Sequence, residues 1–340
     1  MSEKGPVLVT GSAGFIGFHT AQRLLARGET VVGVDNLNDY YDPALKQARL
    51  DLLLPAPGYH HHTLDLADRD GMAALFAEHT PRRVVHLGAQ AGIRYSVENP
   101  ETYIDSNVVG FLTVLEGCRA VGAEHLVFAS TSSVFGANTA LPFSVSQAVS
   151  HPLNVYSATK LANEAMAHAY AYIFGIPMTG LRFFTVYGPW GRPDMALFKF
   201  TRAILEGRPI DVYGEGRMER DFTFVDDIVD GVVAALDTPP GIDATWNADR
   251  PNPSTSGVAP WRLLNLGAGR RERLARYIEV LEQALGRPAV INALPVQGGE
   301  MVRTEAEVTE TRIALDYSPS TPIEVGVQRF VDWYRDFYKA

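Results

Sequence analysis

Tyr156 and Lys160 lie four positions apart in the segment YSATK, a spacing that places both side chains on one face of a helix. A free phenol has a pKa of about 10 and is a weak base at neutral pH, but a neighbouring ammonium stabilises the phenolate. Tyr156 can then take a proton from a hydroxyl while hydride leaves the same carbon. Thr131, at the end of an expected strand, is the candidate hydroxyl donor that completes this catalytic set.

A glycine-rich turn near the N-terminus predicts a dinucleotide site. The segment GSAGFIG (11–17) follows an apolar run and spaces its glycines every third residue. The first glycine permits a tight turn, the second lets the backbone approach a pyrophosphate, and the third lets a helix pack on the strand. The N–H groups at the helix start then face the phosphates. The expected cofactor contacts in this turn are Gly11, Ala13, Gly14, Phe15, Ile16 and Gly17.

Asp35 follows the second expected strand, where a dinucleotide fold places its acidic ribose ligand. A carboxylate accepts hydrogen bonds from the ribose hydroxyls and repels a 2′-phosphate, so the sequence predicts NAD rather than NADP. Asp65 and Leu66, which follow the third expected strand, are candidates for the adenine side of the same site.

The elements that position these residues alternate along the first half of the chain. Strands are expected at 6–10, 30–34, 60–64, 83–87, 125–130 and 178–184, and helices at 14–27, 43–54, 69–79, 100–121 and 156–174. This alternation predicts an α/β fold, a Rossmann-type doubly wound parallel sheet with helices on both faces.

The pattern loosens in the second half, where proline and glycine become frequent. Helices are expected at 226–236, 272–285 and 323–338, and a surface loop at 238–260. We therefore divide the chain into a dinucleotide-binding domain (1–187), to which a segment near 224–240 returns, and a smaller C-terminal α/β lobe (188–340).

Composition excludes several classes of protein. The 340 residues are 46% hydrophobic, which is ample for a folded core, and no run is long and apolar enough to span a membrane. The formal charge of −9 argues against general nucleic-acid binding, and the single cysteine argues for a reducing, cytoplasmic compartment. No metal site is expected, because the adjacent residues 60–62, all histidines, point to opposite faces of a strand.

A family resemblance rests on several of these segments together. TGSAGFIG (10–17), Asp35, HLGAQ (86–90), Thr131 and YSATK (156–160) resemble the extended short-chain dehydrogenase/reductase superfamily. The longer segments 35–50, 89–100, 181–210 and 220–232 look like those of the UDP-glucuronate 4-epimerases.

This resemblance implies bound NAD, a UDP-sugar substrate held mainly by the C-terminal lobe, and a homodimer that pairs the helices 100–121 and 156–174. It adds cofactor contacts at Asn36, Leu87 and Ala89, beside Tyr156 and Lys160.

The residues after Thr131 separate the reactions known in the resembling superfamily, which share oxidation at C4 of the sugar. Dehydratases carry Asp-Glu there, and decarboxylases carry Glu in the place of Ser133, whereas this chain has Ser132 and Ser133. Epimerisation needs no further acid–base pair. Thr185 also replaces the Asn of galactose-type epimerases, which favours a glucuronate substrate. Three alternatives stay open: a 4-epimerase of UDP-glucose or a UDP-N-acetylhexosamine, a UDP-glucuronate decarboxylase, and a non-catalytic NAD-binding regulator.

A 4-keto-uronic acid loses CO₂ when its carboxylate bond aligns with the carbonyl, so an epimerase must hold the carboxylate in another orientation. Ser132, Ser133 and Thr185 are the candidates, because short hydroxyls suit that task. The candidate contacts to the UDP part are Arg94, Arg192, Arg220 and Glu300. Glu300 stands where the resembling family has Asp.

Overall fold

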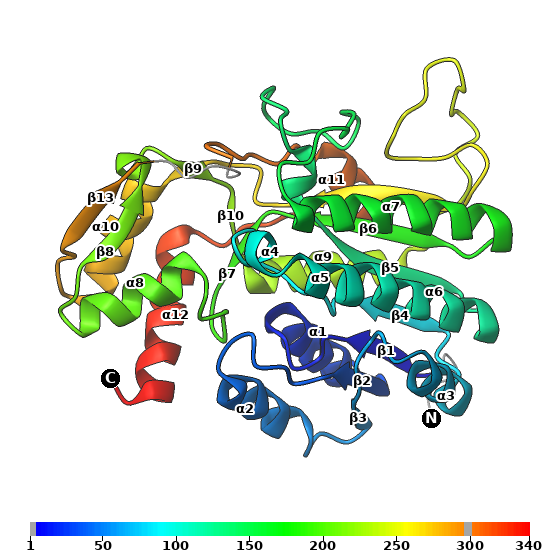
Figure 1. The fold of residues 1–340 in the computed structure, drawn as a ribbon, viewed down its shortest axis with the longest axis horizontal. Coiled ribbons are helices and arrows are strands. Elements are labelled where there is room, and N and C mark those ends of the chain that lie inside the picture. The colour runs from blue at the N-terminus through cyan, green and yellow to red at the C-terminus, as the bar shows by residue number, and fades with distance from the viewer. Residues whose placement is uncertain (1–4, 296–300) are drawn as a thin grey trace.

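The expected strands pair in parallel and form one sheet (Figure 1). In the computed structural model, which describes residues 5–295 and 301–340, the central sheet has seven strands in the order β11-β6-β5-β4-β1-β2-β3. This confirms the α/β, Rossmann-type fold. Its strands are β1 (Val7–Thr10), β2 (Val31–Asp35), β3 (Tyr59–Thr63), β4 (Arg83–His86), β5 (His125–Thr131), β6 (Met178–Phe183) and β11 (Trp261–Leu266).

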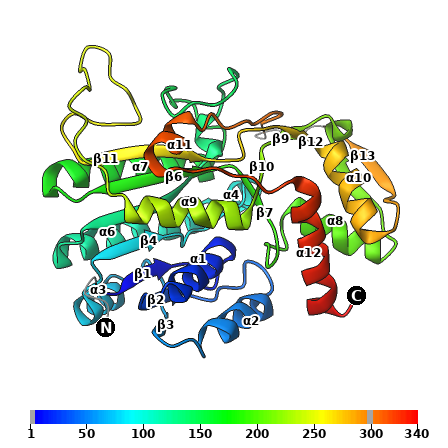
Figure 2. The same cartoon turned by 180° about the vertical axis from the view of Figure 1, so that it is seen from behind.

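Helices cover both faces of this sheet. One face carries α3 (Arg69–His79), α6 (Gly110–Val121) and α7 (Val155–Phe174), which pack against one another in the view of Figure 1. The other face carries α1 (Phe15–Ala26) and α9 (Val225–Asp237), which lie side by side in Figure 2. The segment that contains α9 therefore returns from the second half of the chain to the sheet.

Strand β11 was not among the expected strands, although it forms one edge of the sheet. It pairs in parallel with β6 from Trp261 opposite Met178 to Leu266 opposite Phe183. Polar residues interrupt its apolar pattern, and tertiary hydrogen bonds hold them: Arg262 Nε donates to Thr179 Oγ1 at 3.2 Å. The central sheet thus takes its last strand from the half of the chain that the sequence pattern assigns to the lobe.

Two expected helices differ from the structure. The segment 100–121 is helical throughout but consists of three consecutive elements: α5 (Pro100–Tyr103), the π-helical η1 (Ile104–Val109) and α6. The segment 272–285 begins as a short strand, β12 (Glu272–Arg273), and becomes helical as α10 (Leu274–Leu285). Backbone pairing of β12 with β9 (Glu219–Arg220) is long-range, so local periodicity does not reveal it.

The C-terminal half builds a smaller α/β lobe beside the carboxyl ends of the central strands. Helix α10 packs against α8 (Ala196–Leu205) and α12 (Ile323–Tyr338), and α8 packs against β8 (Ile210–Tyr213), which pairs in parallel with β13 (Ile291–Leu294). A second parallel pair, β7 (Thr185–Tyr187) and β10 (Phe222–Phe224), joins the lobe to the sheet. The remaining elements are α2 (Pro43–Leu53), α4 (Tyr95–Glu98), α11 (Thr309–Leu315), η2 (Ser132–Phe135) and η3 (Gly214–Gly216).

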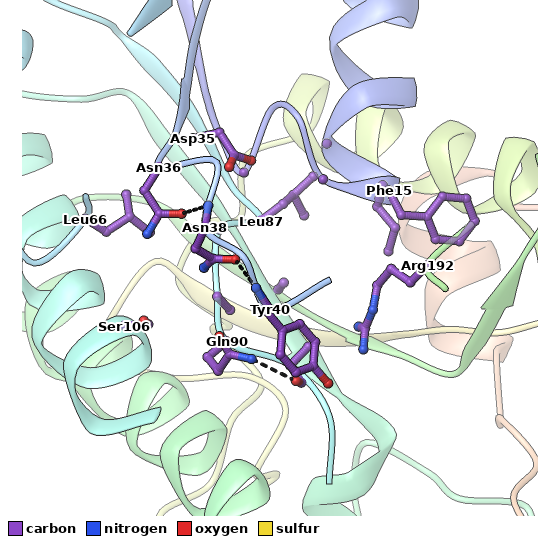
Figure 3. Close-up of a pocket in the computed structure, with 18 of the residues that line it drawn as sticks. Phe15, Asp35, Asn36, Asn38, Tyr40, Leu66, Leu87, Gln90, Ser106 and Arg192 are labelled. Atoms are coloured by element: carbon purple, nitrogen blue, oxygen red, sulfur yellow. Dashed lines mark hydrogen bonds between the residues drawn. The ribbon is translucent and has the colours of Figure 1, made fainter. Parts of the chain in front are cut away.

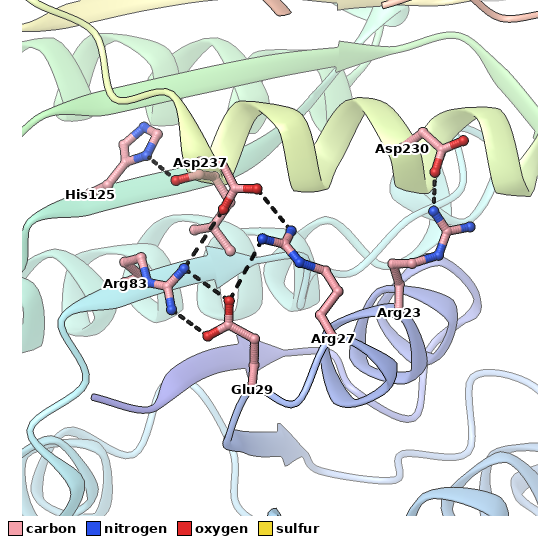
Figure 4. A network of polar contacts seen from close by, with 8 residues as sticks. Arg23, Arg27, Glu29, Arg83, His125, Asp230 and Asp237 are labelled. Atoms are coloured by element: carbon pink, nitrogen blue, oxygen red, sulfur yellow. Dashed lines mark hydrogen bonds and ion pairs between the residues drawn. The ribbon is translucent and has the colours of Figure 1, made fainter. Parts of the chain in front are cut away.

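One apolar core runs from β1 and α1 through α9 to the helices of the lobe. A polar network also ties α9 to the first half (Figure 4). Arg83 pairs with Glu29 through contacts of 2.5 and 3.3 Å, and both side chains are less than 10% exposed. Arg27 reaches Asp237 at the end of α9 at 2.8 Å. In the described ranges, no helix combines the length and the apolar character that a membrane crossing requires.

Candidate active site

Two adjoining cavities lie at the carboxyl edge of the sheet. The first has a volume of about 260 Å³ and is lined by the glycine turn, Asp35, Thr131, Tyr156 and Lys160 (Figure 3). The second has a volume of about 930 Å³ and lies between the sheet and the lobe. Tyr40 and Met195 line both cavities, so a ligand in one touches the wall of the other.

The glycine turn has the geometry of an anion site. Gly11 has a φ of +69°, and a Cβ there would lie 2.7 Å from the Gly88 nitrogen. A Cβ on Gly17 would lie 2.0 Å from the Gly11 carbonyl oxygen. Helix α1 begins directly after Gly14 with no side-chain cap and no acidic residue in its first turn. Its first N–H groups are thus left for an anionic ligand.

Asp35 closes one end of the first cavity. Its carboxylate accepts hydrogen bonds from the backbone N–H of Ala13 at 3.1 Å and of Leu37 at 2.9 Å. Asn36 donates to Asp65 at 2.8 Å. The cavity is lined by the predicted cofactor contacts Asn36, Asp65, Leu66, Leu87 and Ala89, whereas Ala13 is fully buried and does not line it. A ligand with ribose hydroxyls at one end and a diphosphate in its middle fits these groups.

The catalytic set comes together at the other end of that cavity. Thr131 ends β5, and Tyr156 and Lys160 lie in the first turns of α7, so all three side chains line the same cavity. Burial raises the pKa of Tyr156, while the neighbouring Thr131 hydroxyl and the charge of Arg192 oppose that rise. Burial lowers the pKa of Lys160 to about 8, and its ammonium donates to the Ala129 carbonyl at 3.0 Å. Arg192, which the sequence predicts only as a contact to the UDP part, therefore also lowers the pKa of Tyr156 through its charge.

A buried ion pair beneath this set was missed from the sequence. Glu164, one turn after Lys160, accepts hydrogen bonds from Ser130 Oγ at 2.6 Å and from Arg182 Nε at 2.9 Å. Arg182 also donates through Nη2 to the second carboxylate oxygen at 2.8 Å. The four-residue spacing of Lys160 and Glu164 on α7 was the available signal.

Asn107 in the π-helical segment was also missed. Its side-chain oxygen accepts from the Gln90 N–H at 2.8 Å, and its amide donates to the Gln90 carbonyl at 3.0 Å and to Thr159 at 3.0 Å. These bonds fix the backbone that forms the cavity wall after β4. No periodicity in the sequence marks such a role, because the bonds join three separate segments.

The predicted substrate contacts divide between the two cavities. Ser132, Ser133, Thr185, Arg94 and Arg220 line the second cavity. The backbone N–H of Ser133 donates to the Thr131 hydroxyl at 3.1 Å, which places the serines directly beside the catalytic set.

The arginines of that set differ in their surroundings. The Arg94 guanidinium lies 4.7 Å from the centre of the Tyr213 ring, and Arg220 donates to the carbonyls of Glu219 and Val302 at 3.1 and 3.0 Å. Arg192 lines the first cavity and is paired with Asp194 through contacts of 3.0 and 2.5 Å. Burial alone would lower the pKa of Arg192, but Asp194 raises it above its ordinary value. Glu300 lies outside the described residues.

A doubly wound parallel sheet with a glycine turn at its first crossover, facing a Thr/Tyr/Lys set, defines a dinucleotide-dependent enzyme of the short-chain dehydrogenase/reductase type. The chain belongs to the NAD dependent epimerase/dehydratase family, whose sequence profile matches residues 7–248. NAD is accordingly the cofactor of this chain.

Named relatives are similar over nearly the whole chain. A probable UDP-glucuronate 4-epimerase of Rhizobium meliloti is 47% identical over 98% of this chain and 97% of its own length. UDP-glucuronate 4-epimerase 1 of Arabidopsis thaliana is 44% identical over 98% of this chain and 77% of its own length. Among solved structures, a UDP-glucuronic acid 4-epimerase from Bacillus cereus in complex with UDP-glucuronic acid and NAD has a TM-score of 0.87. It is 31% identical and covers 98% of this chain and 100% of its own.

Proposed function

We propose that this protein is a UDP-glucuronate 4-epimerase, which interconverts UDP-glucuronate and UDP-galacturonate. The observation that carries the proposal is the trio of hydroxyl side chains, Ser132, Ser133 and Thr185, on the wall of the second cavity beside the catalytic set. No acidic side chain stands at the two positions after Thr131 to drive elimination or decarboxylation. The relatives named above support the same substrate.

Tyr156 acts as the base and acid at the C4 hydroxyl of the sugar. Bound NAD supplies the acceptor and later the donor of the hydride at that carbon. Tyr156 takes the hydroxyl proton as the 4-keto sugar forms, and returns it after the sugar has turned and presents its other face. Because burial raises the pKa of Tyr156, the positive charges nearby are needed to make its phenolate accessible. Thr131 donates a hydrogen bond that orients the reacting oxygen.

The hydroxyl trio controls the fate of the 4-keto intermediate. This intermediate is a β-keto acid, and it loses CO₂ when the bond to its carboxylate aligns with the carbonyl π system. Ser132, Ser133 and Thr185 hold the carboxylate out of that alignment. Arg94 and Arg220, on the wall of the same cavity, serve the diphosphate, because a guanidinium binds phosphate oxygens through two hydrogen bonds.

We also propose that the protein is a homodimer that pairs the outer faces of α6 and α7, which lie side by side in Figure 1. The outer side of α7 is apolar and accessible: Ala158, Ala165 and Ala169 are exposed, and Tyr172 and Ile173 are 61% and 64% exposed. A cytoplasmic location is part of the proposal, supported by the single cysteine, Cys118, which is buried and unpaired. Light scattering at several protein concentrations tests the dimer.

Incubation with UDP-glucuronate, followed by separation of the sugar nucleotides, tests the reaction. UDP-galacturonate is the expected product. Conversion of UDP-glucose at comparable efficiency would overturn the uronate specificity, and a UDP-pentose as the main product would indicate a decarboxylase. Tyr156→Phe is expected to lower turnover by about 10²–10⁴-fold and to keep NAD bound. Tyr170→Phe is the matched control, because that hydroxyl lies on the same helix and donates to Glu116 outside both cavities.

A further inference from the structure

Arg49 is a buried arginine for which the reaction above gives no role. It lies on α2, on the face that also carries the buried Leu45, Leu50 and Leu53, and its exposure is 0%. In the described residues it forms no ion pair with a carboxylate. A buried guanidinium without a counter-ion is costly, so its charge needs a partner.

The hydrogen bonds of Arg49 join two loops that belong to different parts of the site. Nη1 donates to the Ala13 carbonyl of the glycine turn at 2.8 Å and to the Tyr41 hydroxyl at 2.7 Å. Nη2 donates to the Trp190 carbonyl at 2.7 Å and, more weakly, to the Gly191 carbonyl at 3.4 Å. Nε is buried and has no partner. These acceptors are neutral, so they orient the guanidinium without neutralising it.

Trp190 is held in an unusual conformation at the other end of this link. Its φ is +62°, a region that bulky residues rarely adopt and that the surrounding structure must enforce. Its ring packs between Phe18 of α1 and Trp333 and Phe337 of α12, with ring centres 5.0–5.5 Å apart. In this conformation the Trp190 carbonyl reaches Arg49.

The loop that begins at Trp190 continues into the site. Two residues later Arg192 lines the first cavity, and Asp194, which pairs with Arg192, also accepts a hydrogen bond from Tyr40 at 3.2 Å. Arg49 thus connects the turn that faces the cofactor diphosphate with the loop that carries Arg192 and Asp194.

We propose that Arg49 is a positioning residue that couples the cofactor site to the substrate site, and that the diphosphate of NAD is the counter-ion of its buried charge. Binding of NAD then neutralises Arg49 and stabilises both of its loop contacts, so that Arg192 is in place before the sugar nucleotide arrives. The part of the proposal that concerns NAD rests on the family's cofactor and on this geometry. The substrate part rests on the proposed epimerase function.

Binding to cofactor-free protein, without any sugar nucleotide, tests the cofactor part. Arg49→Met removes the charge and keeps most of the side-chain volume, and we expect it to weaken NAD and ADP-ribose about tenfold, because a buried charge beside the glycine turn attracts the diphosphate through a medium of low dielectric constant. Adenosine, which lacks the diphosphate, should bind both proteins alike. Arg250→Met, in the exposed 238–260 loop, is the matched control and should leave all three affinities unchanged.

Unchanged NAD affinity in Arg49→Met would overturn the proposal, and equal losses for NAD, ADP-ribose and adenosine would show a general structural role instead. Arg49→Lys keeps the charge but cannot reach both loops. Its NAD affinity should stay within about threefold of the original. With NAD saturating, its KM for UDP-glucuronate should rise while kcat changes little. If Arg49→Met does not fold, Arg49→Lys carries the test alone. Its NAD affinity would then have to fall by a smaller factor than its KM for UDP-glucuronate rises. Equal factors would overturn the proposal that the diphosphate is the counter-ion of Arg49. Because the cofactor arm contains no sugar nucleotide, its result stands whether or not the chain epimerises UDP-glucuronate.

Discussion

Glu164→Gln separates the structural and the electrostatic roles of the ion pair beneath the catalytic set. Glu164 is 6% exposed and Arg182 is 0% exposed, and the two share hydrogen bonds of 2.9 and 2.8 Å. The substitution keeps the shape of the side chain but removes its charge, which leaves Arg182 buried without a counter-ion.

The loss of stability follows from that unpaired charge. Breaking a buried pair at one partner costs about 3–5 kcal/mol. With an unfolding entropy of roughly 2.1 cal/mol/K per residue, a chain of 340 residues loses about 1.4 °C in Tm per kcal/mol. We therefore expect Tm to fall by about 4–7 °C.

The effect on catalysis acts through Lys160, one helical turn before Glu164. Burial lowers the pKa of Lys160 to about 8, and the charge of Glu164 opposes that decrease. One unit charge at about 6 Å with an effective dielectric constant near 20 contributes up to about 2.8 kcal/mol, or about 2 pH units. The ammonium is present below this pKa and is lost as the pH rises through it. Removing Glu164 therefore moves the alkaline limb of kcat to lower pH, by about 1–2 units.

The assay is kcat at saturating UDP-glucuronate across pH 6–10, together with thermal unfolding of the same preparations. The double variant Glu164→Leu/Arg182→Met is the control. An apolar pair of similar volume restores stability, but it does not restore the charge near Lys160. We expect its Tm to recover while its alkaline limb stays displaced. An alkaline limb that does not move in Glu164→Gln, despite a lower Tm, would refute the assignment of that limb to Lys160.

Three further predictions concern the scaffold and the cofactor turn. Glu29→Gln leaves the buried Arg83 with only its longer contact to Asp237, at 3.8 Å, and should lower Tm by about 4 °C, with activity at 25 °C unchanged; a shift below about 1 °C contradicts it. Burial lowers the pKa of His86 to about 3 and of His125 to about 4, so the folded protein keeps both neutral while the unfolded chain binds protons below pH 6.5. Each should remove about 2 kcal/mol of stability between pH 7 and pH 5, and His125→Gln should shrink the loss seen in urea unfolding by that amount. Gly17→Ala places a Cβ 2.0 Å from a backbone oxygen of the turn and should yield protein without NAD, measured by the nucleotide released on denaturation.

Features with a local sequence signal were predictable. The glycine turn combines a strand, three glycines and a helix within a few residues, so its conformation follows from its own steric limits. Tyr156 and Lys160 share a helix face by spacing alone. The hydroxyls of Ser132 and Ser133 lie near them because the chain leaves β5 at Thr131, at the carboxyl edge where parallel sheets place their sites.

Features that depend on distant segments were not predictable. Arg49 and Glu164 stand at core-facing positions of α2 and α7, where periodicity alone favours apolar residues. Their partners are the carbonyls of Ala13 and Trp190 in one case and Arg182 on β6 in the other. The sequence pattern does not predict strand β11 for the same reason, because the hydrogen bonds of its polar residues are made to segments that are distant in the chain. Each of these positions is decided by tertiary contacts that no local window contains.

The contrast between local signals and tertiary placement also explains how a chain with a negative net charge can bind an anionic ligand. A formal charge of −9 opposes a ligand that carries a diphosphate and a carboxylate, if the charge is treated as uniform. Exposed charges are screened within about 8–10 Å at physiological salt, whereas a buried cation acts at close range in a medium of low dielectric constant. Arg49 is fully buried beside the glycine turn, and Arg192 lines the cofactor cavity. Whether this acidic protein accepts anionic ligands therefore depends on where a few cations lie and not on its net charge. Arg49 is the most deeply buried of these cations, and Arg49→Met tests its contribution.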